Sequence, residues 1–171
     1  QPIAIVLPAV MSPTTRRLLA EAKTTLPQAR FFRSDLLWPA AAMGAAQTVA
    51  GDGSYALVHL DKADVVAAFD ADILGTEPGA VRMTKGFSKK RKVTGPGQPM
   101  NRLYVVEPSF SSTGAIADHR ARVKAADVGK ALAALATQLG QNGVTVDATI
   151  AGALPQTNLD ARTTKIIAAL A

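Results

Sequence analysis

Short apolar runs alternate along this sequence with segments whose apolar residues recur at helical spacing. Strand-like runs lie at 3–7, 29–33, 64–70 and 102–108, and helix-like segments separate them. Strands that alternate with helices are typical of a mostly parallel sheet covered by helices on both faces. We therefore expect an α/β, three-layer Rossmann-like domain with a mostly parallel sheet of about four or five strands.

Capping residues and prolines predict where the helices begin and end. Ser12 is placed to cap a helix that has Pro13 in its first turn and that Pro27 stops after about Leu26. Asp127 is expected to cap a second helix that ends near Leu139. The remaining expected elements are a helix over 39–50, an extended segment over 121–124, a strand over 144–150 and a final helix from Asn158 or Asp160.

Length and composition are those of a globular chain. The 171 residues are 48% hydrophobic, which suffices for a full core, and we expect a single domain over 1–171. No window approaches eighteen consecutive apolar residues, so we expect a water-soluble domain without a membrane span. The chain begins at Gln1 without a signal-like segment, which favours a processed chain or a piece of a longer one.

The sequence contains no cysteine. Iron–sulfur clusters, disulfides and thiol catalysis all depend on cysteine, so any redox centre is expected to lie outside this chain. The two histidines, His59 and His119, do not form a zinc-binding motif.

Two strand-like runs end in an acidic residue, Asp70 and Glu107. Ligands of open α/β sheets bind beyond the carboxyl ends of the strands, so we expect 70–77 and 107–119 to line one edge. The phosphate-binding patterns GxxxxGK[ST] and GxGxxG are both absent, which makes a standard nucleotide site a weak interpretation. The acids would also repel phosphate.

Polar residues near these strand ends permit catalytic and structural interpretations. Asp70 and Asp72 could form a magnesium site, but turn formation and helix capping are favoured. The run 118–120, Asp-His-Arg, could supply acid–base catalysis. Hydrogen bonds that fix a loop, or an Arg–carboxylate pair, are favoured for it because neighbouring residues of an extended chain point to opposite faces.

Much of the net charge of +6 comes from six cations between Arg82 and Lys92. Such a cluster could attract nucleic acid phosphates, but only Phe87 lies inside it to stack on bases. A solvated surface or a docking surface for an acidic partner is favoured. The residues expected to dock a partner are Arg82, Lys85, Lys89, Lys90 and Arg91.

Large apolar side chains gather around Trp38, with the pairs 31–32 and 36–37 nearby. Packing within the domain or against a neighbour is favoured over stacking on a ligand.

Several segments together carry a resemblance to a known family. They are the opening strand, Ser12-Pro13-Thr14-Thr15, the stretches 63–66 and 70–75, and, most specifically, Asn-Arg-Leu-Tyr-Val-Val-Glu at 101–107 with Thr-Gly-Ala at 113–115 and Ala-Asp-His-Arg at 117–120. In order and spacing these resemble the molybdopterin oxidoreductase family, closest to the large iron–sulfur and molybdopterin-like subunit of alternative complex III. The resemblance extends to about residue 140, and the last thirty residues carry little of it.

This resemblance implies a subunit of a quinol-oxidising, membrane-associated electron-transfer complex in the bacterial cell envelope. The family's large subunit has a molybdopterin-like half that lacks the cofactor and a cysteine-rich half that carries the iron–sulfur clusters. The chain would belong to the first half, as a fragment peripheral to the inner membrane. The implied role is a noncatalytic structural and docking domain, which binds no cofactor and whose partners are other domains and subunits of an oxidoreductase complex.

The alternative is a half-site for molybdopterin guanine dinucleotide, completed by another domain. The residues that would hold the cofactor under this alternative are Gly75, Thr76, Glu77, Pro78, Glu107, Pro108, Ser109 and Asp118. The first turn departs from the usual Gly-x-Asn-Pro pattern of active relatives because Glu77 precedes Pro78. An acid at this position disfavours a pyrophosphate.

Overall fold

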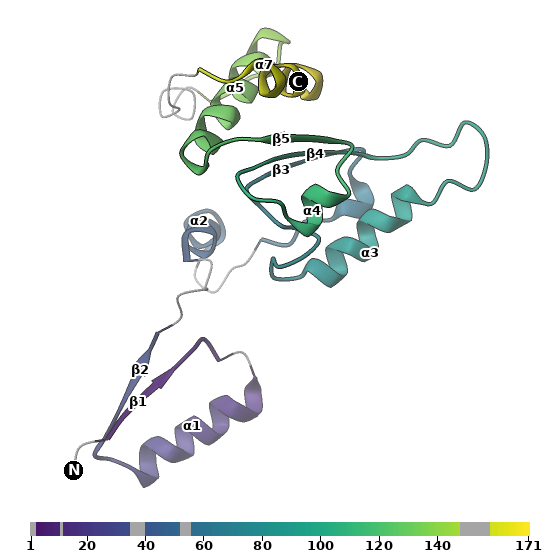
Figure 1. Cartoon of the computed structure of the whole chain (residues 1–171). Coiled ribbons are helices and arrows are strands. Elements are labelled where there is room, and N and C mark those ends of the chain that lie inside the picture. Colours follow the sequence, from purple (N-terminus) through teal and green to yellow (C-terminus); the bar gives the residue numbers. More distant parts are fainter. Residues whose placement is uncertain (1–2, 11, 35–39, 52–55, 148–157) are drawn as a thin grey trace. The chain divides into compact units, whose positions relative to one another are not determined.

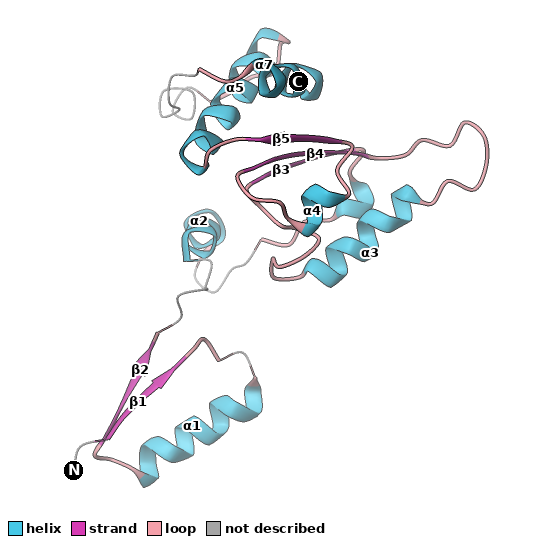
Figure 2. Cartoon of the chain, in the orientation of Figure 1, coloured by secondary structure: helices cyan, strands magenta, loops and turns pink. Residues whose placement is uncertain are grey.

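The computed structural model describes residues 3–10, 12–34, 40–51, 56–147 and 158–171. The chain divides into two compact units, Gln1–Ala56 and Leu57–Ala171 (Figure 1). The described strands form one two-stranded and one three-stranded parallel sheet, accompanied by helices (Figure 2). The predicted α/β class with parallel strands is confirmed, although the larger sheet has three strands instead of four or five.

The first unit is a strand–helix–strand motif followed by a helix. Strand β1 (Ile3–Leu7), helix α1 (Pro13–Thr25), strand β2 (Ala29–Arg33) and helix α2 (Ala40–Ala50) follow one another. The Ser12 hydroxyl accepts a hydrogen bond from the Thr15 amide, so the predicted cap is confirmed. Strands β1 and β2 are parallel, with Leu7 opposite Arg33, so both strands end at the same edge of their sheet.

The second unit is built on a sheet in the order β3-β4-β5, with every neighbouring pair parallel. Its strands are β3 (Val65–Phe69), β4 (Arg102–Glu107) and β5 (His119–Arg122). Helices α3 (Ala80–Arg91) and α4 (Ser112–Ala115) lie on one side of the sheet, and α5 (Val128–Gln141) and α7 (Ala161–Leu170) lie on the other (Figure 1). The described part of this unit also contains two short 3-10 turns, η1 (Leu60–Lys62) and η2 (Ala125–Asp127).

Strand β4 separates two hydrophobic clusters. Because side chains alternate along a strand, Leu103 and Val105 face the α3 side while Val106 faces α5 and α7. The first cluster includes Phe87, and the second includes Ile167. Burial of β4 on both faces explains why its sequence is a nearly continuous apolar run.

The remaining boundaries correct some predictions. Strand β5 begins at His119, two residues before the extended segment expected from Ala121. The described part of the strand predicted at 144–150 (residues 144–147) has no strand structure, and 148–150 fall outside the described residues. Asp127 precedes α5 but does not cap it, because its carboxylate accepts from the Lys130 ammonium group instead. Asp160 does cap α7, through the Arg162 and Thr163 amides.

The described helices are too short or too polar to cross a bilayer. The predicted aromatic cluster is described only in part, because 36–38 lie outside the described residues.

The buried position of Leu103 yields a stability prediction. Leu103→Ala is expected to lower the free energy of unfolding by about 2–5 kcal/mol, because it leaves a cavity beside fully buried neighbours. Leu132→Ala, at a side chain 45% exposed on α5, is the matched control and should cost much less. Urea denaturation measures both variants, and equal losses would contradict the central position of β4.

Candidate functional site

Two turns extend from the carboxyl ends of β3 and β4, where α/β sheets usually bind ligands. The first covers 70–79 and the second covers 108–115. The Asp70 amide donates to the Val106 carbonyl at 2.8 Å, and Asp70 has a left-handed backbone with φ of 48°. Asp tolerates this conformation better than most residues, which allows β3 to turn sharply at its end.

Asp72 and Thr113 join the two turns. The Asp72 carboxylate accepts from both the backbone amide (2.9 Å) and the hydroxyl (2.7 Å) of Thr113, which is fully buried. The Thr113 hydroxyl in turn accepts from the Leu74 amide at 2.9 Å. Asp72 also closes its own turn, because its carbonyl and its carboxylate both accept from the Thr76 amide. The favoured interpretation of Asp72 as a turn residue is confirmed.

Glu107 fixes the second turn from inside. Its side chain, buried at the end of β4, accepts from the Ser111 hydroxyl at 2.5 Å and from the Arg120 guanidinium at 2.6 Å. Ser111 also caps α4 by accepting from the Gly114 amide. A Cβ atom at Gly114 would overlap the Glu107 carboxylate, so only glycine allows this close approach.

Both carboxylates are held in their ionised form. Burial acts to raise the pKa of Asp72, but hydrogen bonds from Thr113 and Thr76 outweigh it and bring the pKa below its ordinary value. Burial likewise acts to raise the pKa of Glu107, and hydrogen bonds from Ser111 and Arg120 lower it overall. Asp72 and Glu107 are therefore both negatively charged at neutral pH, and the Arg120 guanidinium offsets part of the Glu107 charge.

Except for Asp118, the residues predicted for a guanine dinucleotide lie in these turns or at the end of β4. Several backbone N–H groups of the two turns are engaged within the chain. The Gly75, Thr76 and Glu77 amides donate to the Asp72 carbonyl, and the amides of Ser111, Thr113 and Gly114 donate to side chains. Pyrophosphate binding needs free donors and favours positive charge. These turns, with engaged donors and two carboxylates, do not fit it. The other predicted residues here, Pro78, Pro108 and Ser109, are exposed or half-buried.

Asp118 lies away from these turns. It directly precedes β5, and its carboxylate accepts from the Leu103 amide (2.7 Å) at the start of β4. The amino ends of parallel strands share an edge, so Asp118 and Glu107 lie at opposite ends of the sheet. The expectation that 107–119 line one edge is therefore wrong for Asp118 and His119, since the segment containing α4 returns the chain to the amino edge before β5 begins.

The three residues at 118–120 do not converge on one point. Arg91 binds Asp118 through both terminal nitrogens, at 2.9 and 2.5 Å, and this hydrogen bonding is the main reason that the pKa of Asp118 is lowered. The His119 ring stacks on Tyr104, with ring centroids 4.7 Å apart. Arg120 reaches Glu107. The favoured interpretation as Arg–carboxylate pairs and fixing contacts is confirmed.

The basic cluster separates into free and engaged cations. Arg82, Lys85 and Lys89 are exposed on one side of α3, and they line a hollow of about 290 Å³ with His59, Asp61 and Gly86. A second hollow of about 410 Å³ includes Lys89 and Lys92. We call Arg82, Lys85, Lys89 and Lys92 the basic face. Within the described residues, none of these four forms an ion pair.

The other two predicted docking residues stabilise the unit itself. Lys90 pairs with Asp64, which precedes β3. Arg91 forms the bidentate pair with Asp118 and lies 4.7 Å from the centre of the Phe87 ring. Both cations are partly buried, so they are less available to a partner than the basic face.

Sequence reasoning missed Thr113 and Ser111, which organise the site. Ser111 could have been found from its position as a serine cap before a short helical run. Thr113 carries no such signal, because its importance depends on meeting Asp72, forty-one residues earlier in the chain.

A comparison with protein-family models finds no match, and a comparison with curated proteins finds no significant match. Among the described residues, no three His, Cys, Asp or Glu side chains are grouped as a metal site would require. The geometry of the turns and the basic face is therefore the basis for assigning a role.

Thr113→Val tests the connection between the turns. It is expected to cost about 1–3 kcal/mol of unfolding free energy, because the half-buried Leu74 amide loses its acceptor and Asp72 loses the hydroxyl donor, keeping only the Thr113 amide at that oxygen. Thr113→Ser should retain most of the stability. Thr137→Val, the same change on an exposed part of α5, is the control. A loss no larger than that of the control would contradict the connection.

The lowered pKa of Asp118 predicts a pH effect of definite sign. A carboxylate whose folded-state pKa is lowered stabilises the fold above its unfolded pKa, about 4, and this stabilisation is lost as pH falls through the folded pKa. Asp118→Asn should therefore be less stable than the parent at pH 7, with the difference shrinking towards pH 3. Urea unfolding across this range measures the difference. A difference independent of pH would contradict the prediction, and Asp70→Asn at an exposed position is the control.

Proposed function

We propose that this chain is a noncatalytic structural and docking domain in a subunit of a membrane-associated, quinol-oxidising electron-transfer complex. It holds neighbouring domains and subunits in register. Electron transfer takes place on centres in other parts of the assembly. The domain lies at the periphery of the inner membrane in a bacterial cell envelope.

The observation that carries the noncatalytic role is the closed carboxyl edge of the three-stranded sheet. Asp72 with Thr113, and Glu107 with Ser111 and Arg120, use the polar groups that a ligand would need. Such a network is stable because each buried polar group is satisfied internally. An edge organised in this way supports rigid turns, and its amides at 75–77, 111, 113 and 114 are already engaged within the chain.

The docking role is supported by the basic face. Four exposed cations without ion-pair partners in the described structure create a local positive potential. Charges of this kind steer an oppositely charged protein surface and fix its orientation, while adding modest affinity. An acidic surface of a neighbouring subunit is therefore the proposed partner.

The electron-transfer setting comes from the resemblance of 101–107 and 117–120 to the molybdopterin-like subunit of alternative complex III. In the structure, the first segment forms the central strand β4, and the second contains Asp118, which pairs with Arg91. Both roles are structural, as expected of a scaffold. No observation favours the alternative of a guanine-dinucleotide half-site, because the turns that would hold it are engaged with each other.

The decisive experiment is elemental and cofactor analysis of the natural full-length product, purified with its native partners. Iron, without molybdenum, tungsten or extractable pterin, is the expected result, together with quinol oxidation by the assembly. Stoichiometric pterin with molybdenum or tungsten would overturn the proposal. So would an assembly that contains neither iron nor quinol-oxidising activity.

Charge reversal tests the docking surface separately. Lys85→Glu combined with Lys89→Glu should lower the amount of partner subunits that co-purify by about tenfold, because attraction becomes repulsion. Arg122→Glu combined with Lys124→Glu, at two exposed positions near β5, is the control. Equal losses from both pairs would locate docking elsewhere, and unchanged circular dichroism would show that each variant folds.

A further inference from the structure

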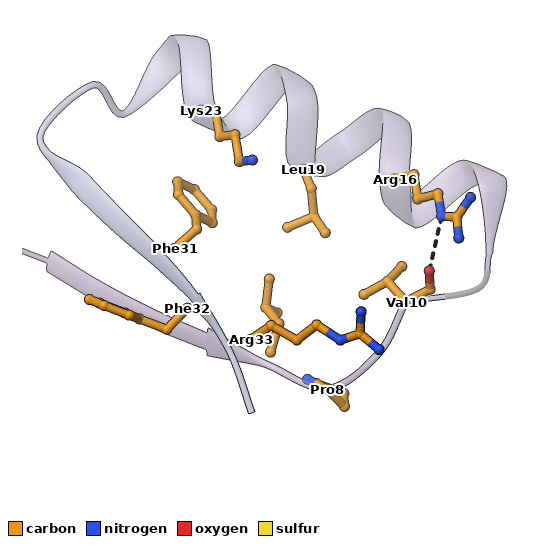
Figure 3. Close-up of a pocket in the computed structure, with 9 residues that line it drawn as sticks. Pro8, Val10, Arg16, Leu19, Lys23, Phe31, Phe32 and Arg33 are labelled. Atoms are coloured by element: carbon orange, nitrogen blue, oxygen red, sulfur yellow. Dashed lines mark hydrogen bonds between the residues drawn. The ribbon is translucent and has the colours of Figure 1, made fainter. Parts of the chain in front are cut away.

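A hollow of about 360 Å³ lies in the first unit, between α1 and the carboxyl ends of β1 and β2. Figure 3 shows Leu19 and Phe31 facing this space from the helix and from β2, while Phe32 projects to the other side of the strand. Val10 and Pro8 close the end nearest the β1–α1 loop. The volume falls within the range of pockets that hold small organic molecules.

The charged residues that line this hollow are all cations. They are Arg16 and Lys23 from α1 and Arg33 from the end of β2 (Figure 3). No Asp or Glu is among the described lining residues. Glu21, the acid of α1, is bound to Arg17, and both side chains are more than half exposed. The helix therefore does not neutralise the hollow with a carboxylate of its own.

Two of the three cations, Arg16 and Lys23, contact other residues that line the hollow. The Arg16 Nε atom donates to the Val10 carbonyl at 3.0 Å, which fixes the guanidinium at the mouth. The Lys23 ammonium lies 5.7 Å from the centre of the Phe31 ring, at a distance that permits a cation–π contact. Positive charge is thus placed around an apolar floor of Leu7, Leu19 and Phe31.

We propose that this hollow binds a small organic anion with an apolar body, such as a medium-chain carboxylate or phosphate ester. The anionic head would lie near Arg16 and Lys23, and the apolar part would cover Leu19 and Phe31. Both parts of the ligand contribute to binding. Arg16 and Lys23 attract the anionic head, and the apolar body shields the side chains of Leu19 and Phe31 from water. This proposal does not depend on the proposed function.

The proposal is tested by titrating the whole chain with octanoate. Binding is monitored by NMR through the backbone amide signals of β1, α1 and β2. Octyl phosphate distinguishes a phosphate head from a carboxylate head. Acetate supplies the charge without the tail, and 1-octanol supplies the tail without the charge. Saturable binding of octanoate or octyl phosphate, at least about tenfold tighter than either partial probe, is expected. Absence of saturable binding, or 1-octanol binding as tightly, would overturn it.

Two adjacent arginines provide a matched pair of variants. Arg16→Met should weaken binding about five- to tenfold, and Lys23→Met should act in the same direction, because each removes a lining charge but keeps an apolar stem. Arg17→Met, on the same helix but outside the lining, should leave binding unchanged. Circular dichroism establishes that all three variants fold. Equal weakening by Arg16→Met and Arg17→Met would refute the site.

Discussion

The hydrogen bonds between Asp72 and Thr113 join two segments that the sheet alone leaves independent. Strands β3 and β4 pair through their backbones, but the turns after them have no such ladder. A single buried threonine supplies a donor to Asp72 and an acceptor to Leu74, so both turns adopt fixed conformations together. The position of α4, the cap at Ser111 and the approach of Gly114 to Glu107 all depend on that arrangement.

Ion pairing divides a run of cations that looks uniform in the sequence. Arg91 and Lys90 lie at the end of α3, where they meet Asp118 and Asp64. A bidentate Arg–carboxylate pair, partly shielded from water, has directional hydrogen bonds that an exposed lysine lacks. Lys85 and Lys89 are exposed and form no ion pair among the described residues, so the same helix carries both structural and surface charge.

Local sequence patterns predicted the helices and strands better than they predicted the contacts between residues of different elements. Ser12 and Pro13 specify the start of α1, and continuous apolar residues specify β3 and β4, because capping and burial act over a few neighbouring positions. The position of Asp118 could not be found in this way, since it depends on where β5 begins and on its parallel pairing with β4. The meeting of Thr113 with Asp72 and the cations around Phe31 likewise depend on tertiary contacts.

The two faces of β4 differ in when their packing partners are synthesised. The cluster on the α3 side, with the side chains packed against it, is complete by Ala117, whereas the opposite cluster needs Ile167 from the end of α7. A chain emerging from the ribosome can therefore pack one layer early, while Val106 and Ala121 lack their full cover until Ile167 has also emerged. During that interval, the uncovered apolar face is the surface that a chaperone would have to shield.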